Sequence, residues 1–175
     1  MYYFVGNNIG HKTAGIERAM INRLNLFKAY QYQAKILLLA WNRYLTQTAS
    51  QYINSEDYVN MYDYFQEASN VTSVFSKNWL HYWRDECGYT IKPVSETNDV
   101  RIYDQQQFIM YAHFADEAYQ KIDYINYFDT SRRKIKRELY DTRGFLSCVR
   151  VLSTDQKIQD RKSTPSELQS QQFIS

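Results

Sequence analysis

The sequence predicts an α/β segment followed by an antiparallel β-meander, and three observations carry this fold class. The first is a strand–helix–strand pattern, with apolar runs at 2–5 and 34–41 on either side of a helical period at 15–30. The second is a change after Gly88 to short alternating runs spaced by about twelve residues, as in antiparallel strands joined by turns. The third is an aromatic share of 17%, with 17 Tyr and 9 Phe, which suits half-buried sheet faces.

The strand–loop–helix segment at the start of the chain is the first candidate site. Tyr2–Val5 is an aromatic and β-branched run of strand length, and the loop after it holds Gly6, Gly10 and Gly15. Glycine lets the backbone approach a ligand closely, and the N–H groups at a helix start favour anionic oxygens. The segment therefore predicts either a phosphate or sugar site at the carboxyl end of a strand, or an ordinary strand–loop–helix unit without a ligand.

The helix and the second strand are predicted from their apolar patterns. Between Gly15 and Tyr30, apolar residues recur at three- and four-residue steps with charged residues between them, which indicates an amphipathic helix. We expect Thr13 to cap its N-terminus and Glu17 to stabilise its first turn. The run 34–41 is almost continuously apolar, which predicts a parallel strand that is buried on both faces.

The next segment predicts a loop and a second helix. Residues 44–54 are polar and are expected to form a loop. Ser55 begins a capping pattern with two acidic residues behind it, so we expect a helix to start there and continue through Ala68. The aromatic cluster 79–83 is expected to pack at the edge of a domain; a stacking platform for a ligand is the alternative.

The meander is predicted from six alternating runs with polar turns between them. The runs are 89–91, 100–103, 108–111, 122–128, 135–140 and 145–151. The turns at 129–132 and 141–144 carry Asp, Thr, Ser and Arg, which bond locally to the backbone. We therefore expect an α/β domain over residues 1–85, a β-meander over 86–160 and a disordered tail over 161–175, whose Ser- and Gln-rich sequence shows no periodicity.

Composition and charge exclude several classes of protein. The net charge of +2 does not call for nucleic acid, and Cys87 and Cys148 form neither a disulfide framework nor a zinc motif. The three histidines have no metal-ligand spacing, and no phosphate-binding or nucleophile motif occurs, so we expect neither a metal site nor a catalytic group in this chain. Without a signal peptide or a membrane-spanning run, the expected compartment is the cytoplasm.

The densest positive patch is the second candidate site. This basic cluster consists of Arg132, Arg133, Lys134, Lys136 and Arg137. On a regular strand, Lys134 and Lys136 would share one face, and Arg137 would lie on the other. Such charges protect an exposed sheet edge, or they bind an anionic partner such as a polyphosphate polymer.

Several separated segments resemble bacterial retaining glycosyltransferases of the fourth sequence family, which have the GT-B fold. The similar enzymes are the poly(glycerol-phosphate) and poly(ribitol-phosphate) α-glycosyltransferases of teichoic acid and the related adhesin glycosyltransferases. The resemblance covers roughly residues 1–158. It is carried by MYYFV at 1–5, AGIERA at 14–19, NRLNLF at 22–27, NMYDYFQ at 60–66, YFD at 127–129, KRELYD at 136–141 and RGFLS at 143–147.

The resemblance implies a partial Rossmann-like N-terminal lobe of a GT-B fold with an inserted β-rich domain. It places Ala14, Gly15 and Ile16 on a loop that faces the nucleotide sugar and the acceptor, with no cofactor besides the UDP-sugar donor of the full-length family. It implies that the meander serves homo- or hetero-oligomerisation or binds the acceptor, and the basic cluster would suit a polyanionic teichoic acid. The implied location is the cytoplasm, including the inner face of the membrane.

The departures from the family define the functional expectation. The donor-site Arg and Lys of these enzymes, and their two glutamates eight positions apart, belong to a C-terminal lobe and have no counterpart in this sequence. We therefore expect a fragment of a hexose-transferring enzyme that is inactive alone. The alternative is a non-catalytic acceptor-binding or assembly module that partners a complete glycosyltransferase. A surface for single-stranded nucleic acid is a third hypothesis.

Overall fold

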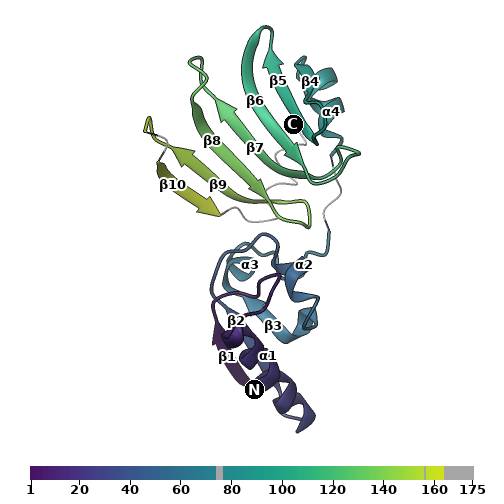
Figure 1. Ribbon diagram of the computed structural model, residues 1–175, viewed down its shortest axis with the longest axis vertical. Coiled ribbons are helices and arrows are strands. Elements are labelled where there is room, and N and C mark those ends of the chain that lie inside the picture. The colour runs from purple at the N-terminus through teal and green to yellow at the C-terminus, as the bar shows by residue number, and fades with distance from the viewer. Residues whose placement is uncertain (74–76, 156, 164–175) are drawn as a thin grey trace. The chain divides into compact units, whose positions relative to one another are not determined.

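The computed structural model describes residues 1–73, 77–155 and 157–163, which form two compact units (Figure 1). The first unit is Met1–Asn70 and the second is Val71–Ser175. The aromatic segment Trp79–Trp83 packs in the core of the second unit, whereas the domain boundary expected at residue 85 assigns it to the first domain.

The first unit is built on a parallel sheet of three strands in the order β1-β2-β3. The strands are β1 (Tyr2–Gly6), β2 (Ala34–Leu38) and β3 (Tyr58–Asn60), and α1 (Gly15–Ala29) connects the first two. Residue Tyr2 lies opposite Ala34, and the register continues to Gly6 opposite Leu38. The predicted strand–helix–strand unit is therefore confirmed.

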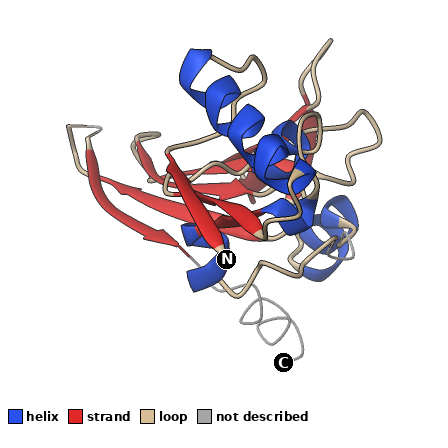
Figure 2. Ribbon diagram, turned by 90° about the horizontal axis from the view of Figure 1, so that it is seen from below, coloured by secondary structure: helices blue, strands red, loops and turns tan. Residues whose placement is uncertain are grey.

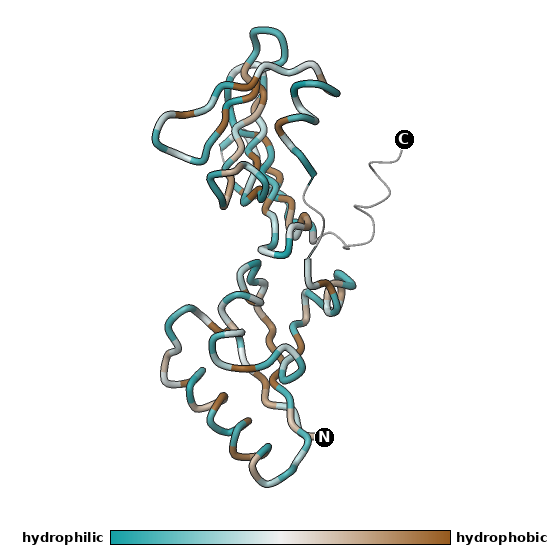
Figure 3. Tube along the Cα trace, turned by 90° about the vertical axis from the view of Figure 1, so that its right-hand side faces the viewer, coloured by the Kyte–Doolittle hydropathy of each residue, from teal (hydrophilic) through white to brown (hydrophobic). Residues whose placement is uncertain are grey.

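The core of this unit lies between α1 and one face of the sheet. Met20, Ile21 and Leu24 of α1 are buried together with Ile36 and Leu38 of β2. Figure 3 shows hydrophobic and hydrophilic residues alternating along α1, as expected for a helix with one buried face.

The opposite face of the same sheet is open. Burial alternates along β2, and the side chains of Tyr3 and Val5 on β1 are 56% and 63% exposed. The expectation that both faces of the second strand are buried was wrong, because α1 covers one face and no described element of this unit covers the other.

The segment after β2 differs from its prediction in two places. The short helix α2 (Leu45–Ala49) lies inside the expected loop. Instead of one helix from Ser55, the chain forms the 3₁₀ turn η1 (Ser55–Asp57), the strand β3 and the helix α3 (Met61–Phe65). The Asn60 side chain caps α3, so helix starts only after three residues have paired with β2.

The second unit is a seven-stranded antiparallel sheet in which each strand pairs with its neighbour in sequence (Figures 1 and 2). The strands are β4 (Thr90–Pro93), β5 (Asp99–Asp104), β6 (Gln107–Phe114), β7 (Ile122–Phe128), β8 (Lys134–Tyr140), β9 (Leu146–Leu152) and β10 (Ile158–Ser163). The predicted meander is confirmed. The expected tail begins too early, because 161–163 belong to β10 and pair with β9; residues 164–175 lie outside the described part of the chain.

The aromatic cluster covers one face of this sheet. It forms the helix α4 (Trp79–His81) and the π-helical segment η2 (Tyr82–Glu86). Trp83 is 3% exposed, and its ring lies 5.4 Å from Trp79 and 6.3 Å from Phe114. This packing confirms the expectation of a packed aromatic edge, and it leaves the other face of the sheet for polar side chains.

Candidate functional site

The loop after β1 is tied to α1 by the carboxylate of Glu17. Its Oε2 accepts a hydrogen bond from the Ala14 N–H at 2.8 Å, and its Oε1 accepts one from the Gly10 N–H at 3.3 Å. The residue that precedes α1 is Ala14 instead of the expected Thr13, so this reach-back from the third helical position stabilises the helix start. An internal anion therefore already satisfies part of the donor set that a ligand phosphate would use.

Neighbouring loops hold this loop at the carboxyl edge of the parallel sheet. The Asn42 side chain donates to Asn8 Oδ1 at 2.9 Å, and Thr48 Oγ1 donates to the Ile9 carbonyl at 2.9 Å. The Tyr52 hydroxyl donates to the His11 carbonyl at 2.8 Å. The carboxyl edge is thus an ordered polar surface, in the place where open α/β sheets bind ligands.

The predicted loop residues lie together at the start of α1. Ala14 precedes the helix, Gly15 is its first residue, and the Ile16 side chain is 84% exposed. A Cβ added to Gly15 would meet no atom within 4 Å, whereas one added to Gly6 would lie 2.4 Å from Met20 Sδ. Packing accounts for the glycine at position 6 and leaves the glycine at position 15 unexplained, so a role for 14–16 in ligand binding stays a prediction.

Replacing Glu17 by Ala is expected to lower the free energy of unfolding of the first unit by about 1 kcal/mol, because two loop N–H groups lose their acceptor. Glu17→Gln is the matched control, since it keeps an oxygen acceptor at the same position. Hydrogen exchange of the Gly10 and Ala14 amides is the measurement. Equal protection in both variants would show that the carboxylate does not hold the loop.

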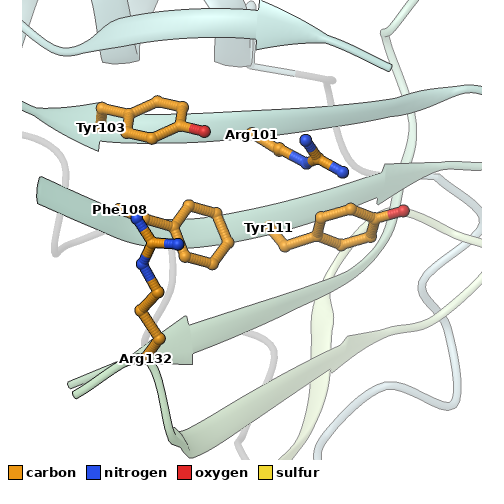
Figure 4. A pocket seen from close by; sticks show the side chains of 5 residues that line it. All are labelled: Arg101, Tyr103, Phe108, Tyr111 and Arg132. Atoms are coloured by element: carbon orange, nitrogen blue, oxygen red, sulfur yellow. The ribbon is translucent and has the colours of Figure 1, made fainter. Parts of the chain in front are cut away.

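The second unit carries an open hollow of about 410 Å³ on the sheet face opposite α4 and η2. It is lined by Arg101 and Tyr103 of β5, Phe108 and Tyr111 of β6, and Arg132 of the β7–β8 turn (Figure 4). Sequence reasoning found Arg132 and missed the other four. The sequence held a signal for two of these four, because Arg101 and Tyr103 alternate along β5 with Val100 and Ile102, which are buried.

Aromatic rings form the floor of this hollow. The Phe108 ring lies 5.6 Å from that of Tyr103 and 4.6 Å from that of Phe128. Lys92 Nζ lies 4.9 Å from the Tyr103 ring centre. Cations over an apolar floor suit a ligand that combines negative charge with aliphatic or sugar carbon.

A buried carboxylate orders the polar side of the hollow. Asp99 accepts a hydrogen bond from the Tyr111 hydroxyl at 2.5 Å, and its other oxygen lies 2.5 Å from His113 Nδ1. Burial acts to raise the pKa of Asp99, but the hydrogen bonds from Tyr111 and His113 outweigh it, and the pKa lies below its usual range. Burial and the same carboxylate raise the pKa of Tyr111 to about 12, so the phenol remains a donor at neutral pH.

Replacing Tyr111 by Phe is expected to lower the free energy of unfolding by about 1.5 to 3 kcal/mol at pH 7, the usual contribution of a hydrogen bond to a charged group. A carboxylate with a lowered pKa stabilises the fold above its unfolded-state pKa, and this contribution is lost as the pH falls through the folded-state value. The difference between wild type and variant should therefore shrink below about pH 4. Urea unfolding at pH 7 and pH 3 measures it, and a difference that does not depend on pH would contradict this role of Asp99.

The structure separates the basic cluster. A β-bulge places Lys134 opposite Phe128 and Lys136 opposite Tyr127, which are adjacent residues on β7. Since adjacent strand residues point to opposite faces, Lys134 and Lys136 lie on opposite faces of the sheet. The expectation that they share one face was wrong. Arg137 lies opposite Asn126, so it shares the face of Lys134 and of the hollow.

Members of the basic cluster have local partners. Lys136 Nζ lies 2.9 Å from Glu138 Oε1, and Arg133 Nε lies 3.0 Å from Asp129 Oδ2. Arg132 lines the hollow, and the Arg137 guanidinium lies 4.0 Å from the Tyr124 ring centre. Polyanion binding by the cluster stays a prediction, and its geometry favours the members on the hollow face.

The described residues, 1–73, 77–155 and 157–163, contain neither a cluster of metal ligands nor a helix that could span a membrane. No group of three or more His, Cys, Asp or Glu side chains in this part of the chain could hold a metal ion. In the same ranges, no helix has the length and apolarity needed to cross a bilayer.

The fold defines a class: it matches the N-terminal part of GT-B glycosyltransferases, with a parallel α/β sheet followed by an antiparallel meander sheet. No protein-family model matches the chain, and neither does any curated protein. The fold predicted from the sequence resemblance is thereby confirmed.

Three solved structures represent this likeness. The chain is similar to a structure of accessory secretory proteins 1, 2 and 3 of Streptococcus pneumoniae, with 16% identity, a TM-score of 0.67, and coverage of 95% of this chain and 35% of that one. It is similar to S. aureus TarM in complex with fondaparinux, α-GlcNAc-glycerol and UDP, with 14% identity, a TM-score of 0.55, and coverage of 93% and 38%. It is also similar to the pneumococcal O-GlcNAc transferase GtfA in complex with UDP and GlcNAc, with 12% identity, a TM-score of 0.52, and coverage of 97% and 40%.

The chain therefore spans well under half the length of these matching chains. At these identities the likeness shows the fold, and activity requires separate evidence.

Proposed function

We propose that this chain is the acceptor-recognising part of a glycosyltransferase that moves a hexose from a nucleotide sugar to teichoic acid or to Ser/Thr of a surface protein, and that these 175 residues alone do not transfer sugar. The observation that carries the proposal is the basic and aromatic hollow on a meander sheet that follows a GT-B-like strand–loop–helix unit. Recognition is the part of the reaction for which this chain has a built surface.

The expected inactivity rests on what the transfer step requires. A departing nucleoside diphosphate needs positive groups placed against its phosphates in the transition state. At the carboxyl edge of the first unit, the described loop instead presents the Glu17 carboxylate, bonded to the Gly10 and Ala14 amides. The carboxylate competes with donor phosphates for these amides, which supports the expected inactivity.

Transfer assays test this proposal directly. The chain is incubated with radiolabelled UDP-glucose or UDP-GlcNAc and purified teichoic acid, and polymer-bound label is counted against a blank without protein. We expect no label above the blank, together with retention of the protein on teichoic acid in a pull-down. Label transfer by the 175 residues would refute the expected inactivity, and a failure to retain the protein would refute recognition of a teichoic acid acceptor.

An assembly role is the second candidate, and a specific observation favours it. Among the similar structures are complexes of accessory secretory proteins 1, 2 and 3, of Gap123 from Streptococcus agalactiae and of GtfA/B. The open face of the first sheet, with Tyr3 and Val5 more than half exposed, is an apolar surface of the kind that contacts a partner. Co-purification with a complete glycosyltransferase, lost on Val5→Lys but retained on Ile16→Lys, would support it; an equal effect of both changes would not.

A further inference from the structure

The strand register of the second sheet places four arginines in one row across the strands, together with a tyrosine and an asparagine. Arg101 of β5 lies opposite Tyr111 of β6, which lies opposite Asn126 of β7. Asn126 lies opposite Arg137 of β8, Arg137 opposite Arg150 of β9, and Arg150 opposite Arg161 of β10. These six residues are called the cation row below, and Lys92 of β4 extends it beyond Arg101.

All members of the row point to the face of the hollow. Directly opposed residues of antiparallel strands share a face, and Arg101 and Tyr111 line the hollow on that face. Their strand neighbours Val100, Ile102 and Ala112 point to the covered face and are buried in the core. Arg101 and Arg161 are exposed at the two ends of the row, and the residues between them are half-buried.

The arrangement concentrates positive charge on one face of the sheet. Like charges directly opposite one another destabilise a strand pair, yet Arg137, Arg150 and Arg161 occupy three consecutive opposed positions. No acidic residue takes a position in the row. Such a line of like charge on one face of a sheet attracts anions.

The chemistry of the row specifies the shape and charge of its ligand. Its six strands span five intervals of about 4.8 Å, or about 24 Å, so the row is longer than any single phosphate group. The Asn126 Oδ1 atom in its middle is buried without a hydrogen-bond partner in the described structure. A linear polymer that carries repeated negative charges matches the length and the charge of the row.

The aromatic rings beside the row favour a polyol phosphate over a nucleic acid. Nucleobases need exposed ring faces for stacking. The Tyr124 ring contacts the Arg137 guanidinium and stacks on His113 at 5.2 Å, and the Phe108 and Phe128 rings contact each other. These rings are occupied by one another and by protein cations, so they offer apolar edges to aliphatic carbon.

We propose that the cation row binds a linear polyol phosphodiester laid across the strands of the second sheet, with one phosphate near each arginine. This inference deepens the proposed acceptor recognition and rests on it. It moves the centre of the polyanion site from the basic cluster, which lies in the β7–β8 turn and on β8, to a line of residues that also crosses five other strands. It assigns Arg101, Arg150 and Arg161 a role that the cluster did not include.

Two neighbouring residues of β10 provide a matched test. Arg161 lies opposite Arg150 in the row, whereas Lys162 lies opposite Val149 on the other face and pairs with Asp160 at 3.5 Å. Arg161→Gln and Lys162→Gln remove the same charge from adjacent exposed positions of one edge strand. A general electrostatic effect would act on both, and binding in the row would act on Arg161 alone.

Binding is measured on the full chain by fluorescence anisotropy with an end-labelled glycerol-phosphate polymer, over a series of salt concentrations. We expect Arg161→Gln to weaken binding about fivefold at 0.1 M salt and to reduce the salt slope by about 0.7, the value for one lost contact to a single strand. Arg101→Gln, at the far end of the row, should do the same for polymers longer than about 24 Å and less for shorter ones. Lys162→Gln should change affinity by less than twofold.

The outcomes separate the row from the proposed function. If the polymer binds and Arg161→Gln and Lys162→Gln weaken it equally, the row is refuted while acceptor recognition stands. If the polymer does not bind to the wild-type chain, the row and the recognition of a teichoic acid acceptor both fail. Tighter binding of an oligouridylate of equal charge, with the same dependence on Arg161 and Arg101, would identify a nucleic-acid surface and overturn the inference.

Discussion

Replacing Asp141 by Asn is expected to lower the free energy of unfolding of the second unit by about 3 to 5 kcal/mol, the usual cost of breaking a buried ion pair by removing one partner. Arg143 Nε lies 2.7 Å from Asp141 Oδ1, and Nη2 lies 3.0 Å from Oδ2. The side chains of Arg143 and Asp141 are 5% and 3% exposed. Burial excludes water as a substitute partner, so the variant keeps a buried guanidinium without its carboxylate. Guanidinium-induced unfolding followed by tryptophan fluorescence measures the loss.

The double variant Asp141→Asn/Arg143→Met provides the control. Once both charges are absent, no uncompensated ion remains, and a buried pair often contributes little relative to apolar replacements. We expect the double variant to be clearly more stable than the sum of the two single changes predicts, with a coupling energy of about 1 to 3 kcal/mol. Additive losses would mean that the two side chains act through separate contacts.

This turn illustrates what the sequence could and could not establish. Residues 141–144 contain Asp, Thr, Arg and Gly, which predicted a tight turn, and the structure has Gly144 at φ 100° and a 2.9 Å hydrogen bond from its N–H to the Asp141 carbonyl. The ion pair was not predicted, because a two-residue spacing of opposite charges usually occurs at an exposed surface. Burial of the pair depends on tertiary packing around it.

The prediction of which sheet face each residue of the basic cluster occupies was wrong for a related reason. Alternation along a strand assigns faces correctly only while the strand is regular, and the bulge between Lys136 and Lys134 reverses the assignment. Nothing in the residues from Arg132 to Arg137 marks the bulge. The cation row could not be predicted from the sequence either, because it depends on the registers of six strand pairings. Turn lengths and bulges determine these registers.

The parallel sheet shows the limit set by short elements. The strand β1, the helix α1 and the strand β2 are long enough for their periodicity to be visible, and they were predicted within a few residues. The strand β3 has three residues and the helix α3 has five, so neither completes a recognisable period. Asn60 separates these two elements, and its side chain decides where strand ends and helix begins.

Replacing Asn60 by Ala is expected to lower the free energy of unfolding of the first unit by about 2 to 4 kcal/mol, from a lost helix cap and unsatisfied carbonyl groups. Asn60 Oδ1 accepts hydrogen bonds from the N–H groups of Tyr62 at 2.9 Å and Asp63 at 3.1 Å. Its Nδ2 donates to the carbonyls of Leu38 at 3.4 Å and Ala40 at 3.0 Å. One side chain, 4% exposed, thus joins the end of β2 to the start of α3.

The variant Asn60→Ser separates the two contributions. Serine caps a helix about as well as asparagine does, but its short side chain does not reach the carbonyls beyond β2. We expect Asn60→Ser to restore protection of the Tyr62 and Asp63 amides from hydrogen exchange and to recover about half of the stability lost in Asn60→Ala. Because the Ala40 carbonyl lies at the carboxyl edge that also holds the Gly10 loop, the amides at this edge should exchange faster in both variants. Unchanged exchange there would show that Asn60 stabilises α3 alone and does not order the edge of the sheet.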